Sequence, residues 1–325
     1  RPYHLLAKGG DNLTLYFKTN ERITGVDETI SNTLLEPIVE FKAGVDKVFR
    51  ALVSRNNAPL DSQTDESLHK GLHWKAVLQI DTNSVPNFSD LESDLGFTVN
   101  ILDPSGNMYS ATDKSSSMPK PTDENDQELT ARIDTLAPEL SKVVLESSND
   151  GLSDTELGDS YLLARAEDTL TLRFETNEQI IDASATDRVP EVIFTYTDES
   201  GTEVTRSAMV TSDTGTTNQS FVATYELDSL NDSEIESDVG FRIRLHDRSG
   251  NEKSFEVSDT ESLSTEVSDG NTLRIDTVAP ELSKVVLESS NDGLSDTELG
   301  DSYLLARAED TLTLRFETNE QIIDA

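Results

Sequence analysis

Apolar residues recur at every second position in short segments along the whole chain. Residues 170–174 place Leu, Leu and Phe at alternate positions, and residues 241–245 place Phe, Ile and Leu in the same way. Segments 74–80 and 97–101 repeat this alternation. A period of two indicates a β-strand with one buried and one solvent-facing side, whereas a helix repeats its apolar residues about every 3.6 positions. The pattern therefore predicts an all-β protein.

Turn residues separate the predicted strands. Asp198–Gly201 and Asp247–Asn251 have the composition of hairpin turns, in which Gly or Asn accepts a positive φ. Further short apolar runs occur at 38–41, 143–145 and 192–194. About seven short strands in roughly 140 residues are typical of two antiparallel sheets packed face to face. We expect such a sandwich to be the basic unit of the chain.

The chain also repeats itself. Residues 132–183 and 274–325 are the same segment, except that Leu136 is replaced by Val278. Near-identity over this length indicates tandem duplication, and a longer array of such units is the natural parent.

A weaker copy begins the chain. Residues 5–23 match residues 162–180, and Trp74 stands where the later copy has Phe221, which predicts that Trp74 lies in a core. Most of the extra residues of the first copy lie between 24 and 74, as expected of an insertion in loops. We therefore divide the chain into three units: residues 1–133, a sandwich that lacks its opening strand and has longer loops; residues 134–275, a complete sandwich; and residues 276–325, the opening segment of a third.

Several short motifs carry a family resemblance. Asp-Thr-x-Ala-Pro occurs at 134–138 and 276–280, Ala-Thr-Tyr at 223–225, Gly-Phe at 240–241 and Asp-x-Ser-Gly-Asn at 247–251. In these motifs the chain resembles the bacterial immunoglobulin-like repeats of giant surface adhesins and biofilm-associated proteins. The resemblance implies tandem immunoglobulin-like β-sandwiches at the bacterial cell surface or outside the cell. It also implies that the units act as extender modules, with the adhesive tip elsewhere.

The charge of the chain excludes several partners. Its 63 acidic and 26 basic side chains give a net charge of −37, and it has no cysteine. Such a chain has too few cations to neutralise nucleic-acid phosphates or to dock on anionic lipid, and it attracts cations. No apolar run reaches the roughly 18 residues of a membrane span. Disulfides and thiolate chemistry are excluded, so packing, repetition or calcium must stabilise the units.

Calcium is the cofactor that the acidic residues suggest, because it prefers several hard oxygen ligands. If sandwiches pack end to end, Asp134 and Asp276 in the linkers lie near Glu178, Asp247 and Asn251, and an ion there would fix the angle between units. The acidic loop with Asp150, Asp154 and Asp159 is a second candidate. Neither segment has the spacing of an EF-hand. The alternative is that these acids form a solvated surface that keeps the protein soluble.

Catalysis is not expected. The sequence has no Gly-x-Ser-x-Gly nucleophile elbow, and none of its four histidines belongs to a recognisable triad. His69 and His73 are spaced for a metal on one face of an element, but Gly71 disfavours a helix, so we expect a plain loop here rather than a metal site.

The leading hypothesis is therefore a non-catalytic stalk. Pro138 and Pro280 restrict the backbone of the linkers and favour a semi-rigid rod of units stacked head to tail. Neighbouring repeats or identical chains are the expected partners, and segment 280–289 of a second chain is a candidate for the missing opening strand. The alternative is a module that binds a carbohydrate or a host protein through the loops of residues 24–74.

Overall fold

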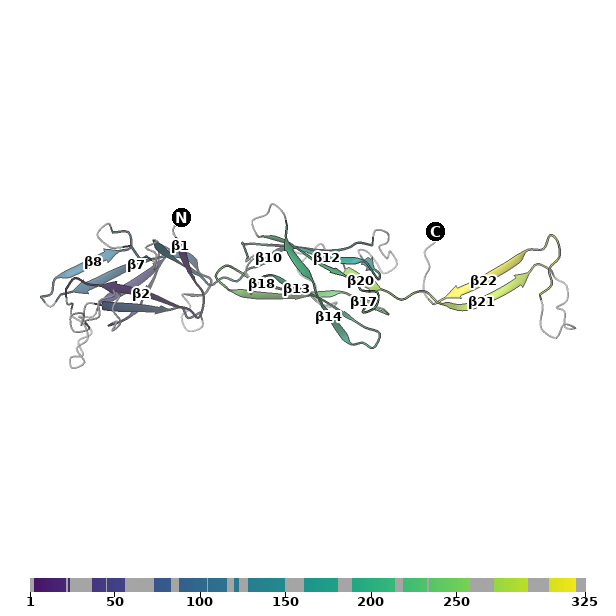
Figure 1. Cartoon of the computed structure of the whole chain (residues 1–325), viewed down its shortest axis with the longest axis horizontal. Coiled ribbons are helices and arrows are strands. Elements are labelled where there is room, and N and C mark those ends of the chain that lie inside the picture. The colour runs from purple at the N-terminus through teal and green to yellow at the C-terminus, as the bar shows by residue number, and fades with distance from the viewer. Residues whose placement is uncertain are drawn as a thin grey trace.

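The computed structural model consists of β-strands and loops. It describes residues 3–21, 23, 37–44, 46–55, 73–82, 88–103, 105–115, 120–122, 128–149, 161–180, 189–213, 219–232, 234–257, 272–291 and 304–319. In these ranges the strands form two sandwiches and a separate hairpin, which follow one another along the longest axis of the molecule (Figure 1). No helix in the described ranges is long and apolar enough to cross a membrane. The predicted fold class, tandem immunoglobulin-like β-sandwiches, is confirmed.

The first sandwich is built from a six-stranded and a three-stranded sheet. The larger sheet has the order β1-β9-β7-β3-β4 with β8 also paired to β7, and the smaller has the order β2-β6-β5. The bounds are β1 Tyr3–Ala7, β2 Asn12–Lys18, β3 Ile38–Ala43, β4 Lys47–Arg50, β5 Leu52–Arg55, β6 His73–Gln79, β7 Glu92–Leu102, β8 Met108–Thr112 and β9 Leu129–Asp134.

The second sandwich repeats this plan with one more strand on its smaller layer. That layer has the order β10-β12-β16-β15, and the opposite layer consists of β11-β20-β17 and β14-β13-β18-β19. The bounds are β10 Leu140–Ser147, β11 Tyr161–Ala164, β12 Thr169–Thr176, β13 Glu191–Thr197, β14 Glu203–Ser207, β15 Met209–Ser212, β16 Ser220–Glu226, β17 Glu236–Asp238, β18 Gly240–His246, β19 Glu252–Val257 and β20 Thr272–Asp276.

The alternation predicted from sequence becomes the core of each sandwich. In strand β12 the side chains of Leu170, Leu172 and Phe174 are buried, and those of the residues between them are more exposed. Successive side chains of a strand point to opposite faces of its sheet. Trp74 is buried in the first sandwich, as predicted, and pairs across the sheet with Phe17.

One expectation about strand direction was wrong. We expected only antiparallel pairs, but β1 pairs with β9 and β11 pairs with β20 in parallel register. In both sandwiches an early strand, β1 or β11, therefore lies beside the last strand, β9 or β20, in the same layer. Alternation sets which face of a strand is buried but carries no information on the direction of its neighbour. The strands also exceed about seven per unit, because one face is divided into shorter segments such as β17 and β18.

The third unit contributes a hairpin. Strand β21 (Leu282–Ser289) pairs with β22 (Leu312–Thr318) in the register that β10 and β12 adopt in the second sandwich. Both pairings carry an irregularity at the same place, between Leu140 and Lys142 and between Leu282 and Lys284. The duplicated sequence therefore folds the same way twice.

Candidate metal centre at the first junction

The linker between the sandwiches is fastened to the first sandwich by Thr135. Its hydroxyl donates to the carbonyl of Phe88 (2.7 Å) and accepts the backbone N–H of Leu91 (3.0 Å). The backbone N–H of Thr135 donates to the carbonyl of Leu91 (2.9 Å). These contacts hold Asp134, the last residue of β9, at the end of the first sandwich.

A tight turn of the second sandwich meets Asp134. After β18, the buried Asp247 accepts hydrogen bonds at Oδ1 from the N–H groups of Gly250 (2.6 Å) and Asn251 (2.8 Å). Asn251 Nδ2 donates to Asp247 Oδ2 (2.6 Å). Gly250 has φ of 88°, a conformation that side chains other than glycine disfavour. The predicted turn is therefore built around one carboxylate.

Two side chains of this turn bridge the sandwiches. Ser249 Oγ donates to Asp134 Oδ2 (3.1 Å), and Asn251 Nδ2 donates to the backbone carbonyl of Asp134 (3.0 Å). A further tie runs along the start of the second sandwich, where the N–H of Glu139 donates to Asn177 Oδ1 (2.8 Å). Asp134 thus lies at the end of a strand of the first sandwich and accepts hydrogen bonds from the second.

Three carboxylates converge at this junction. Asp134, Glu178 and Asp247 each place an oxygen within 4.8 Å of the others. Burial and the charge of Asp247 raise the pKa of Asp134. Burial, together with the charges of Asp247 and Asp134, raises the pKa of Glu178 to about 7. Like charges held together out of water repel, and a divalent cation removes that repulsion. Carboxylate, amide and carbonyl oxygens are the ligands that calcium prefers.

The structure brings together four of the predicted residues: Asp134, Glu178, Asp247 and Asn251. Asp276 occupies the place of Asp134 at the end of β20, where the N–H of Val278 donates to its Oδ1 (3.1 Å). Asp150, Asp154 and Asp159 lie outside the described residues.

The first sandwich carries half of the same site. Glu21, Asp103 and Asn107 take the places of Glu178, Asp247 and Asn251, and Asn107 binds Asp103 with the same pair of hydrogen bonds, both 2.7 Å. Here the hydrogen bonds of Asn107 lower the pKa of Asp103. Of the described residues, only the junction carboxylates form a cluster that could hold an ion. At the junction, Asp134 adds a third carboxylate to Glu178 and Asp247.

Sequence reasoning missed the anchors around the site. Ser249 and Thr135 carry no distinctive signal in a chain rich in Ser and Thr, although both belong to the repeated motifs. Acidic residues of segment 231–238 pair with arginines instead of joining this site. Asp232 is buried and pairs with Arg206, while Glu236 and Asp238 pair with Arg274.

The other candidates contribute no defined site. The loop expectation is wrong for His73, which lies buried at the start of β6, and His69 lies outside the described residues. Most of the loop residues of segment 24–74 are also outside the described ranges, and the carbohydrate- or protein-binding alternative stays untested.

Comparison with known proteins leaves the family open. No family model and no curated protein matches the chain. Similar solved structures include a tetra-tandem repeat from the extending region of a large adhesion protein (12% identity, TM-score 0.27, covering 87% of this chain and 55% of that one). The chain thus spans about half the length of that protein.

Two further structures are of proteins from Streptococcus species. The C-terminal domain of the AgI/II polypeptide BspA of Streptococcus agalactiae has 11% identity and a TM-score of 0.28, with 85% of this chain and 93% of that chain covered. The sialic acid binding region of a Streptococcus sanguinis SK1 adhesin has 11% identity and a TM-score of 0.20, with coverage of 86% and 76%. Superposition is weak in all three cases, so the fold assignment rests on the sheets and registers above.

Proposed function

We propose that this chain is a non-catalytic extender segment of a bacterial surface or secreted adhesin, in which sandwiches are joined into a stiff rod by a calcium ion at each junction. The single observation that carries the proposal is the double attachment of Asp134. Its neighbour Thr135 is hydrogen-bonded to the first sandwich, and Asp134 itself is hydrogen-bonded to Ser249 and Asn251 of the second. A linker that is hydrogen-bonded to the units on both sides restricts the angle between them.

The linker after the second sandwich makes contacts equivalent to those of the first linker. Thr277 accepts the N–H of Ile235 (2.8 Å), as Thr135 accepts that of Leu91. The N–H of Glu281 donates to Asn319 Oδ1 (2.7 Å), as that of Glu139 donates to Asn177. These contacts fasten both linkers to the unit before and the unit after in the same way, which supports a joint that is repeated along the chain.

The acidic surface suits this role. A net charge of −37 keeps neighbouring rods apart and raises the local concentration of cations. An ion held by Asp134, Glu178 and Asp247 would join carboxylates of both sandwiches, so its removal would release the joint. Attachment to a cell surface, adhesion and a place in biofilm are the settings that the resemblance to adhesin repeats implies.

The proposal is tested by scattering and calorimetry on the whole chain. After treatment with a chelator, addition of calcium should release or absorb heat at one principal site and should lengthen the particle or narrow its distribution of shapes in small-angle X-ray scattering. The chain with Glu178→Gln and Asp134→Asn should lose both responses. The matched control is Glu21→Gln with Asp103→Asn, which alters the half-site of the first sandwich and should leave both responses intact. No heat and no change in scattering with calcium would refute the ion, and a compact particle would refute the rod.

A further inference from the structure

The two linkers of the second sandwich are attached at opposite ends of the same strands. The turn after β18 donates hydrogen bonds to Asp134, where the chain enters. Before β17, the N–H of Ile235 donates to the hydroxyl of Thr277 (2.8 Å), where the chain leaves. Strands β17 and β18 follow each other over residues 236–246, which extend for roughly 35 Å at about 3.3 Å per residue. A pull on the two linkers therefore acts along the strands, in line with the row of units in Figure 1.

The strands beside the linkers are the first to carry such a pull. Strand β10 follows the incoming linker and pairs with β12, and β20 precedes the outgoing linker. Strand β20 lies between β11 on one side and β17 on the other. The last strand of the sandwich is therefore held from both sides.

The pairing of β11 with β20 is parallel, from Tyr161 opposite Thr272 to Ala164 opposite Ile275. A pull on the outgoing linker reaches β20 at its C-terminal end. A pull on the incoming linker reaches β11 at its N-terminal end, because β11 follows β10 in the chain. Parallel strands pulled in these opposite directions slide along each other, so the evenly spaced hydrogen bonds of the ladder must break together. Strands pulled apart from one end lose their hydrogen bonds one at a time.

Buried side chains also hold this ladder in place. Leu273 and Ile275 of β20 are fully buried, and Ala164 of β11 is buried beside them. Sliding β20 toward the outgoing linker would draw these side chains out of a close-packed core. The ladder and the core therefore resist the same movement.

An arginine fastens β20 to β17 on its other side. Arg274 binds Glu236 (3.0 Å) and Asp238 (3.2 Å) of β17. Ion pairs near the surface add little to the free energy of unfolding. These two lie across the pair of strands that a pull would slide, so they act on the movement that matters under tension.

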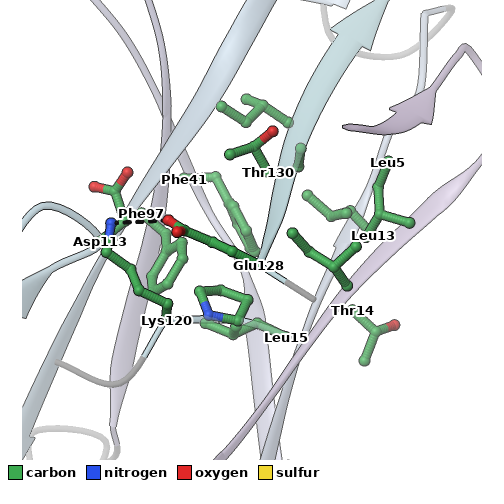
Figure 2. Close-up of a pocket in the computed structure, with 14 residues that line it drawn as sticks. Leu5, Leu13, Thr14, Leu15, Phe41, Phe97, Asp113, Lys120, Glu128 and Thr130 are labelled. Carbon is green, nitrogen blue, oxygen red and sulfur yellow. Dashed lines mark ion pairs between the residues drawn. The ribbon is translucent and has the colours of Figure 1, made fainter. Parts of the chain in front are cut away.

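The first sandwich has the same arrangement, although its sequence and loops differ. Strand β1 pairs with β9 in parallel. Leu5 of β1 and Thr130 of β9 both line the space between the two layers (Figure 2). Arg132 of β9 binds Glu92 (2.6 Å) and Asp94 (3.0 Å) of β7. The parallel pair and its arginine therefore belong to the plan of the repeat.

We propose that the parallel pair of β11 and β20 is a mechanical clamp, which keeps the second sandwich folded under tension along the chain until the whole ladder shears. The pair of β1 and β9 does the same in the first sandwich. This function goes beyond the proposed extender, because a spacer needs length and stiffness but not resistance to force. It depends on strand direction and not on calcium.

Single-molecule pulling of the whole chain in a chelator tests the clamp. The chain has no native cysteine, so handles attach at introduced ones. Ala137→Cys with Ala279→Cys places the handles at equivalent positions of the two linkers and loads the ladder in shear. Arg165→Cys with Ala279→Cys places them after β11 and after β20, at one end of the ladder, so the strands are peeled apart. The shear geometry should need at least about twice the force to unfold the second sandwich. Equal forces in the two geometries overturn the proposal.

Proline substitutions separate the clamp from a general loss of stability. Alternate N–H groups of β11 face β20, so one of Leu162→Pro and Leu163→Pro removes a hydrogen bond of the ladder. Val210→Pro is the matched change in β15, an outer strand of the opposite layer. All three should unfold at lower denaturant concentrations, but only a proline in β11 should lower the shear force, by at least about a third. Equal losses of force in β11 and β15 contradict the clamp.

The two attachment geometries leave the ladder unaltered, so they decide the question even where a proline variant does not fold. Because chelator is present throughout, the outcome is also independent of the junction. A sandwich that unfolds at the same force in both geometries refutes the clamp and leaves the calcium-joined rod standing. A rod that fails to respond to calcium leaves the clamp standing.

Discussion

The first and second sandwiches share a fold but solve the same packing problem with different chemistry. In the first, Phe49 and Phe88 stack with ring centroids 4.2 Å apart. The register places Arg206 of the second sandwich where the first has Phe49, and Asp232 takes the place of Phe88. A buried aromatic pair in the first sandwich and a partly buried ion pair in the second thus occupy the same place. Repeats of one plan can therefore differ sharply in how they respond to pH and to substitution.

The ion pair of the second sandwich is fully satisfied. Asp232 accepts hydrogen bonds from Tyr196 (2.6 Å), Tyr225 (2.7 Å) and Arg206 (2.7 Å), and also from the backbone N–H of Asp228 (2.9 Å). Burial alone would raise the pKa of Asp232, but the hydrogen bonds from Tyr196, Tyr225 and the other donors outweigh it and lower that pKa. Such a network is costly to interrupt, because each remaining partner is left without its acceptor.

The largest effect is expected from Asp232→Ala. Loss of the carboxylate leaves Arg206 and two tyrosine hydroxyls without their partner, which should lower the free energy of unfolding of the second sandwich by about 3–5 kcal/mol. Asp232→Asn should cost less, because its amide oxygen still accepts hydrogen bonds. Chemical denaturation followed by fluorescence and circular dichroism gives both values. A loss below about 1 kcal/mol for the alanine variant would mean that the network contributes little.

The same network should make the stability of the second sandwich depend on pH in the acid range. Because the pKa of Asp232 is lower in the folded state than in the unfolded state, its stabilising contribution is present above the ordinary aspartate pKa of 3.8 and is lost as the pH falls through the folded value. The stacked pair of Phe49 and Phe88 has no such dependence. This acid dependence should disappear in the Asp232→Asn variant.

The edge strands offer a second comparison. Leu172 and Leu15 occupy equivalent positions, opposite Ala223 and Ala76, but only Leu172 is fully covered. Leu172→Ala should destabilise the second sandwich by about 2–5 kcal/mol, and Leu15→Ala should cost the first roughly half as much. Chemical denaturation gives both values, and equal costs would mean that the difference in exposure between the two leucines does not set the cost.

The sequence patterns predicted those features of the structure that depend on residues close together in the chain. The alternation around Leu170 to Phe174 gives the buried face of β12, and the Asp-x-Ser-Gly-Asn motif gives the turn around Asp247. The junction residues were predicted by placing repeated units end to end. The parallel pairing of β1 with β9 was not predicted, because it joins segments far apart in sequence. The buried network of Asp232 was not predicted either, because an acidic residue in an acidic loop is usually solvated.

The junction and the half-site of the first sandwich differ in their response to pH. The pKa of Glu178 is about 7 in the folded protein, above its ordinary value of 4.5, so the folded state binds more protons between these values. In the absence of divalent cations, stability should therefore rise as the pH falls from about 7 toward 4.5, by on the order of 1 kcal/mol after allowance for solvent screening. Calcium at pH 8 should supply the same stabilisation by neutralising the carboxylates.

Glu178→Gln checks this assignment, because glutamine neither titrates nor carries a charge. The variant should be more stable than the wild type at pH 8 without calcium and should lose most of the pH dependence between 7 and 4.5. Glu21→Gln is the matched change at the half-site. Thermal unfolding of the whole chain at several pH values distinguishes them, and an unchanged profile for Glu178→Gln would place the titration on another group.

The smallest effect is expected at the turn that precedes β2 and β12. In the first sandwich this turn has Gly10 at φ of 90°, whereas the second has Glu167 at φ of 73°. Both turns are otherwise alike, since Asp11 accepts the N–H of Lys8 (2.9 Å) as Asp168 accepts that of Arg165 (2.8 Å). A residue with a Cβ is strained at this φ, while glycine gains entropy in the unfolded state. Glu167→Gly should therefore stabilise the second sandwich by no more than about 1 kcal/mol.

The reverse change in the first sandwich sharpens this last comparison. Gly10→Glu should destabilise by a similar amount, because the turn conformation is retained and no atom lies within 4 Å of the added Cβ. The only cost is then the backbone strain, and differential scanning calorimetry can resolve the two opposite shifts in melting temperature. Shifts of the same sign would show that the charge of the glutamate, rather than its backbone conformation, governs the stability of this turn.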